Sequence, residues 1–131
     1  MKKSNHFLNR PDLILRIGIA GEFMGHGVFA LMTKPGWIPY FTSVGISESL
    51  AGTLLPLIGT LDLIVAAIVL FKPYKFVLAW ATFWGLTTAL IQPISGEPIW
   101  DFVERFVNFA ASLALLSLNG IPKKFKDWFK A

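Results

Sequence analysis

Four long apolar segments dominate this chain of 131 residues. They run from about residue 12 to 32, 50 to 71, 74 to 92 and 101 to 119. Each segment approaches the roughly 20 residues that an α-helix needs to cross a bilayer. The pattern therefore predicts an all-α integral membrane protein, folded as one four-helix bundle over residues 1–131.

The composition agrees with a membrane protein. Hydrophobic residues make up 54% of the chain and charged residues 15%, with a mean hydropathy of +0.59. Soluble domains usually carry about a quarter of charged residues. The net charge of +4 comes largely from lysines and arginines near the ends of the apolar segments, which is a signal of membrane topology. We therefore expect the lipid bilayer, and no nucleic acid, as a partner.

The distribution of basic residues predicts that both termini lie on the cytoplasmic side. In that orientation Lys72, Lys75 and the C-terminal lysines share one side, and Lys34 is the only Lys or Arg in the two outer loops. The tail over residues 122–131 carries Phe125, Trp128 and Phe129 at helical spacing among lysines, which predicts a short interfacial helix.

Prolines and aromatic residues mark the predicted connections. Seven of the eight prolines fall between the spans, Pro93 among them, and only Pro56 lies inside one. The outer connection over 33–49 contains Trp37, Tyr40 and Phe41, which favours a segment lying at the membrane interface.

The first span combines glycines with ionisable residues on one face. At about 100° per residue, Glu22 and His26 lie about 40° apart, and Gly18 and Gly25 fall on the same arc. Gly21 and Gly25 have the spacing that lets another helix approach closely. A packing groove alone explains the glycines, but it does not explain Glu22 near the bilayer midplane. This face predicts a functional role for Glu22 or His26.

The fourth span places Glu104 and Asn108 on one face, with Arg105 beside it. Adjacent residues on a helix do not face each other, so we expect the counter-charge of Arg105 to come from another helix or a bound ligand rather than from Glu104. Asp101 and Glu22 are the candidates. In the alternative interpretation, Glu104 and Arg105 merely extend to the outer interface.

The two middle spans add further polar groups. Trp84, Thr88 and Gln92 follow one side of the third span, although plain helix packing also explains the tryptophan. A lone carboxylate such as Asp62, in the middle of the second span, must be protonated, paired or hydrated. Together the faces and depths predict an outward-opening polar pocket formed by Glu22, His26, Asp62, Trp84, Thr88, Gln92, Glu104, Arg105 and Asn108.

Several chemistries are disfavoured for this chain. Without cysteine it forms no disulfide or thiolate metal site of its own, and no His/Cys cluster with ligand spacing predicts a metal. Haem is disfavoured because His26 is the only histidine in a span. No nucleotide-binding or hydrolase motif identifies a catalytic residue. A quinone head group fits carboxylates, an arginine and two tryptophans, and so does a path for protons or small anions.

Three stretches together resemble one known family. They are RIGIAGEFMGHG (Arg16–Gly27), PLIGTLDLIVA (Pro56–Ala66) and TALIQPISGEPIWDFVERFVN (Thr88–Asn108). In this order, on four spans, they resemble the DoxX/DoxD-like family of small bacterial membrane proteins. The likeness covers residues 13 to 118. Its strongest local parts are the Arg and the glycine-flanked His of the first stretch, the Gly59-x-x-Asp62 pattern and the Glu104-Arg105-x-x-Asn108 pattern.

The resemblance implies a multi-pass protein of the bacterial inner membrane with a link to redox chemistry, because DoxD-type proteins are subunits of a thiosulfate:quinone oxidoreductase. We expect a quinone-facing or assembly subunit that acts with a membrane or peripheral redox partner, or as a homo-oligomer. Without cysteine, the chain alone is not expected to oxidise a sulfur compound. A small proton-coupled transporter that uses Glu22 and Asp62 is one alternative. A purely structural membrane subunit is another.

Overall fold

The computed structural model describes residues 6–131, which form only helices and turns. The longer helices are α1 (Pro11–Leu31), α3 (Glu48–Phe71), α4 (Lys75–Ile94) and α6 (Phe106–Leu118). Shorter ones are η1 (Pro35–Trp37), α2 (Ile38–Thr42), α5 (Ile99–Val103) and η2 (Phe125–Phe129). Helices α1, α3 and α4 are long and apolar enough to cross a membrane. The prediction of an all-helical, multi-pass membrane protein is confirmed at this level.

The predicted fourth span is wrong as a single continuous helix. Helix α5 ends at Val103 and α6 begins at Phe106, with a turn at Glu104 and Arg105 between them. The backbone N–H of Arg105 bonds to the carbonyl of Phe102, three residues back, at 3.1 Å. Such an i to i−3 bond tightens the chain and interrupts the α-helical ladder. Helix α6 has 13 residues, too few to cross a bilayer alone.

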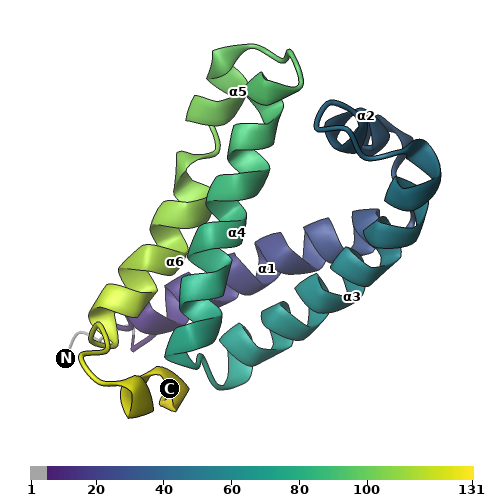
Figure 1. Ribbon diagram of the computed structural model, residues 1–131. Coiled ribbons are helices and arrows are strands. Elements are labelled where there is room, and N and C mark those ends of the chain that lie inside the picture. The colour runs from purple at the N-terminus through teal and green to yellow at the C-terminus, as the bar shows by residue number, and fades with distance from the viewer. Residues whose placement is uncertain (1–5) are drawn as a thin grey trace.

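The longer helices pack as two pairs, α1 with α3 and α4 with α6 (Figure 1). The two pairs cross at an angle. They meet at one end of the molecule, where α1 and α4 begin and where α3 and α6 end. We call this the Arg16 end, and the opposite end, which carries α2, the α2 end. The buried core fills the half near the Arg16 end, where all four helices contribute; its largest fully buried side chains are Ile19, Val69, Leu78 and Leu115.

The closest approach between helices lies at Gly27 of α1 and Gly59 of α3. A Cβ atom added to Gly59 would lie 2.6 Å from the carbonyl oxygen of Gly27 and 2.8 Å from the backbone nitrogen of Leu31. The predicted close contact at Gly21 and Gly25 is not formed within the described chain, because a Cβ at either glycine would meet nothing within 4 Å. The small-residue contact that holds α1 against α3 is therefore on another face of α1.

The connections differ from the predictions at one proline. Helix α4 continues to Ile94 and so includes Pro93, which was predicted to lie in the loop. At the start of α3 the hydroxyl of Ser47 accepts a hydrogen bond from the Leu50 N–H at 3.2 Å, which caps the helix. The tail forms the 3₁₀-helix η2 and is tied to α4 by the bond from Lys75 N–H to the Lys130 carbonyl at 3.0 Å.

The Gly27–Gly59 contact predicts that two glycines of α3 differ in how much an alanine substitution destabilises the fold. We expect Gly59→Ala to destabilise the fold by roughly 1–3 kcal/mol, because the new methyl group meets backbone atoms that cannot move aside. The matched control is Gly52→Ala in the same helix, where the methyl group enters open space. Thermal unfolding of the detergent-solubilised variants, followed by circular dichroism, measures both. Equal unfolding temperatures for the two variants would contradict the assignment.

Candidate functional site

A pocket of about 430 Å³ lies in the half of the molecule near the α2 end. Its walls come from α1, α2, α3 and α4, from the connections around α2, and from the turn before α6. Six of the nine residues predicted from the sequence line this pocket, namely His26, Asp62, Trp84, Thr88, Gln92 and Arg105. The fold therefore brings together polar side chains that lie almost 80 residues apart in the sequence.

Three predicted residues do not line the pocket. Glu22 is half-buried on α1 and lies within electrostatic range of Asp62 and Arg105. Asn108 lies where α6 crosses α4, since a Cβ added to Gly85 would meet its backbone at 3.2 Å. Glu104 is exposed at the turn between α5 and α6.

The ion pair of Arg105 differs from the prediction. Its Nη2 atom lies 3.9 Å from Oε1 of Glu104, the neighbour that helical geometry seemed to exclude. The two side chains meet because the helix is interrupted at these residues. With the Glu104 side chain 66% exposed, the pair contributes little to stability.

Asp62 is the most deeply buried ionisable residue of the pocket, with 2% of its surface exposed. Its carboxylate interacts with the side chain of Trp84 on α4. The Oδ1 atom, however, has no hydrogen-bond partner among the described residues. Burying such an atom without a partner costs about 1–3 kcal/mol, and the cost is larger when the group is charged. Asp62, which lines the pocket, therefore carries a buried oxygen that lacks a hydrogen-bond partner.

Arg105 carries a second unsatisfied atom on the same pocket. Its Nε atom is buried and has no hydrogen-bond partner among residues 6–131. Because the guanidinium group is always ionised and its N–H groups only donate, this atom can be satisfied only by an acceptor. Two residues that line the pocket thus each carry one buried, unpaired polar atom, a carboxylate oxygen on α3 and an N–H donor before α6.

The segment around α2 forms a wall that sequence analysis assigned to the membrane interface alone. The hydroxyl of Tyr40 donates to Oε1 of Gln92 at 3.0 Å and so joins α2 to α4. The ring of Trp37 meets His26 edge to face, with centroids 5.6 Å apart. Both residues line the pocket. The available sequence signal was that Tyr and Trp carry a polar tip, which can turn toward a buried partner as well as toward water.

The remaining polar groups restrict what the pocket can do. The Thr88 hydroxyl donates to the Gly85 carbonyl at 3.2 Å, so it offers a ligand only an acceptor. Trp84 is stacked on Trp80, with centroids 5.6 Å apart and planes 10° from parallel, which fixes its ring. Within the described residues, no group of three or more His, Cys, Asp or Glu side chains is placed to hold a metal ion. The arrangement suits binding of a largely apolar molecule through a few hydrogen bonds.

The fold and pocket define the class of this protein as a helical multi-pass membrane protein with a largely apolar, partly aromatic pocket between its helices. Comparisons with protein-family models, curated proteins and solved structures find no match for the chain. The resemblance to the DoxX/DoxD-like family therefore stays a prediction from the sequence.

The Tyr40–Gln92 hydrogen bond predicts how firmly α2 covers the pocket. Tyr40→Phe removes the bond, worth about 1 kcal/mol, so we expect roughly five-fold faster hydrogen exchange in α2. Ser43→Ala is the control, since its hydroxyl bonds only to the Tyr40 carbonyl within the same segment. Exchange detected by mass spectrometry measures the effect. An unchanged rate in Tyr40→Phe would show that this bond does not hold α2 in place.

Proposed function

We propose that the pocket binds the head group of a quinone and that the protein is a quinone-facing or assembly subunit of a membrane redox complex. The observation that carries the proposal is the pair of unsatisfied buried atoms, Asp62 Oδ1 and Arg105 Nε, on residues that line the same pocket. Native proteins rarely leave such atoms unpaired, so a bound molecule that pairs both of them accounts for their presence.

The reduced form of a quinone, the quinol, has both chemical groups that these two atoms require, and the oxidised form has the acceptor alone. A quinone carbonyl oxygen accepts a hydrogen bond from Arg105 Nε, and a quinol hydroxyl donates one to Asp62 Oδ1. The flat rings of Trp37 and Trp84 supply aromatic surface beside them. The volume of about 430 Å³ lies within the range of small-molecule sites, about 300–1,000 Å³.

The walls of the pocket favour a ligand that is itself soluble in the membrane. Besides its aromatic residues, the lining contains five aliphatic side chains, those of Val44, Ile46, Leu55, Ile58 and Ile91. Burying a ring and the start of an isoprenoid chain against such residues is favourable by about 25 cal/mol per Å² of apolar surface. A small, strongly hydrated anion would gain nothing from these walls.

The finer membrane arrangement is part of the same proposal. Together α5 and α6 form the fourth crossing beside α4, and both termini face the cytoplasm of a bacterium, with the protein in its inner membrane. The charge distribution supports this orientation. The Arg16 end carries Arg10, Lys72, Lys75 and the lysines of the tail, whereas the α2 end carries Glu48, Glu97, Asp101 and Glu104.

A proton-coupled path is the second candidate function. It is favoured by Glu22, which is half-buried in a spanning helix and within electrostatic range of Asp62. Two carboxylates at membrane depth are typical of proton relays. In vesicles with an entrapped pH-sensitive dye, this function requires proton flux that Glu22→Gln abolishes. The quinone-binding function requires none.

The quinone proposal predicts saturable binding of a decyl-substituted benzoquinol, the reduced form that can both accept from Arg105 and donate to Asp62, to the detergent-solubilised protein. Quenching of tryptophan fluorescence measures it, because Trp37 and Trp84 line the pocket. We expect Asp62→Asn and Arg105→Gln each to raise the dissociation constant roughly ten-fold, the effect of losing one hydrogen bond to a charged group.

The matched control is Arg10→Gln, an exposed arginine at the other end of the molecule whose partner is Asp12. It should leave the dissociation constant unchanged. Quenching that never saturates, or that is the same in Asp62→Asn, Arg105→Gln and the unaltered protein, would contradict binding in this pocket. Mass spectrometry of the gently solubilised protein adds an independent readout, since a co-purified quinone or redox partner is expected.

A further inference from the structure

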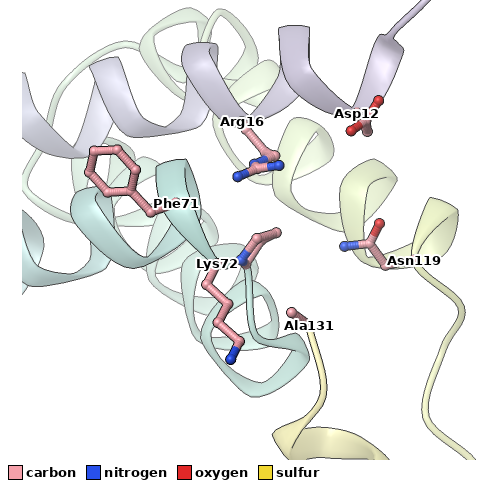
Figure 2. A pocket seen from close by; sticks show the side chains of 7 residues that line it. Asp12, Arg16, Phe71, Lys72, Asn119 and Ala131 are labelled. Atoms are coloured by element: carbon pink, nitrogen blue, oxygen red, sulfur yellow. The ribbon is translucent and has the colours of Figure 1, made fainter.

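A second cavity, of about 400 Å³, lies at the Arg16 end, far from the pocket described above. It is formed where α1 begins, α3 ends and α6 ends, so it lies at the level where the apolar helices give way to water. Figure 2 shows the residues that line it, with the side chains of Arg16 and Asn119 directed toward the space between the helices. We call it the Arg16 cavity.

Arg16 is fixed in this cavity by the end of a neighbouring helix. Its Nε donates to the carbonyl of Val69 at 3.2 Å, and its Nη2 donates to the carbonyl of Leu70. These are carbonyls of the last turn of α3, which lack partners within their own helix. Within residues 6–131 the remaining terminal nitrogen, Nη1, makes no hydrogen bond to another residue. The guanidinium group is thus held rigidly while part of it stays available to a ligand.

The charges around the Arg16 cavity favour an anion. Asp12 is the only acidic side chain that lines it, and Asp12 is already bound by Arg10 through two hydrogen bonds of 2.9 Å and 3.1 Å. Lys72 and Ala131 line it as well, and the Nζ atom of Lys72 lies over the ring of Tyr74, 5.2 Å from its centroid. Across the cavity Asn119 supplies an amide, which can donate two further hydrogen bonds.

The tail beside the cavity increases the positive charge at this end. Lys130 Nζ lies 2.7 Å from Asp127 Oδ1, and this hydrogen bond lowers the pKa of Asp127, so the pair stays ionised and neutral overall. Lys123, Lys124 and Lys126 then remain as uncompensated charges. Lysines near a membrane surface attract anionic lipids by about 1 kcal/mol each.

Exposed apolar side chains distinguish a lipid from a free anion as the ligand. Phe71 lines the cavity and is 77% exposed, and Phe125 and Ile121, which follow α6 in the chain, are 78% and 60% exposed. Free phosphate would use only the polar groups. A lipid would place its phosphate at Arg16 and Asn119 and its chains against these exposed side chains.

We propose that the Arg16 cavity is a binding site for the phosphate group of an anionic membrane lipid. Arg16 and Asn119 hold the phosphate oxygens, Lys72 adds a positive charge beside the site, and the exposed apolar side chains contact the acyl chains. This site is separate from the quinone pocket and does not depend on it, because the core residues Ile19, Leu78 and Leu115 fill the space near the Arg16 end.

Native mass spectrometry of the full-length protein tests the site. The protein is titrated with phosphatidylglycerol, with phosphatidylcholine and with inorganic phosphate. We expect tighter binding of phosphatidylglycerol than of phosphatidylcholine, and a roughly five-fold loss of that affinity in Lys72→Gln, the effect of one interfacial charge. Asn119→Leu should lower the affinity as well. Lys34→Gln, which removes one lysine at the α2 end, is the control and should leave it unchanged.

Arg16 itself is a poor first variant, because its bonds to α3 also support the fold. Lys72→Gln and Asn119→Leu avoid this, since neither side chain makes a hydrogen bond within the part of the chain that the structure describes, and the exposed Lys72 only lies over the ring of Tyr74. Equal binding of the two lipids, or an equal loss in Lys72→Gln and Lys34→Gln, would overturn the site. Inorganic phosphate that displaces the lipid at equal concentration would overturn its assignment to a lipid.

Discussion

The close contact between Gly27 and Gly59 determines where the polar groups of this protein lie. With no side chain on either residue, the backbones of α1 and α3 touch, and the space between them is fixed. His26 precedes the first glycine, and Asp62 follows the second by three residues, almost one helical turn. The same contact therefore brings both side chains to the edge of one pocket. A wider separation of α1 and α3 would expose Asp62 to lipid.

The interruption at Glu104 and Arg105 adds the charged side chain of Arg105 to the pocket. A continuous helix would have pointed Arg105 between its polar and apolar faces, with the neighbouring Glu104 directed elsewhere. In the observed turn the two charges meet, and Arg105 reaches the pocket with its Nε atom buried. A break in a membrane helix is tolerated where it lines a cavity rather than lipid. Its position beside the pocket accords with that rule.

Hydropathy was sufficient to predict the helical class and three apolar helices, because the length of a crossing is imposed by the bilayer. Nine candidate residues were predicted from helical faces and depths, and six of them line one pocket in the structure. The break at Glu104 escaped prediction because neither Gly nor Pro marks it in the sequence. The close helix contact was predicted at the wrong glycines. Gly21 and Gly25 have the four-residue spacing typical of helix packing, whereas the contact at Gly27 depends on a partner glycine 32 residues away.

Two half-buried arginines, one at each end of the molecule, differ in how their hydrogen bonds are satisfied. Arg16 and Arg105 are both half-buried, yet the first is bonded to two carbonyls of α3 and the second leaves a buried N–H unpaired. A charge that the fold itself satisfies can be explained by stability. A charge that the fold buries and leaves unsatisfied lowers stability, and so does the unpaired oxygen of Asp62. Because both costs fall on residues of one pocket, a single ligand that carries an acceptor and a donor would offset them together.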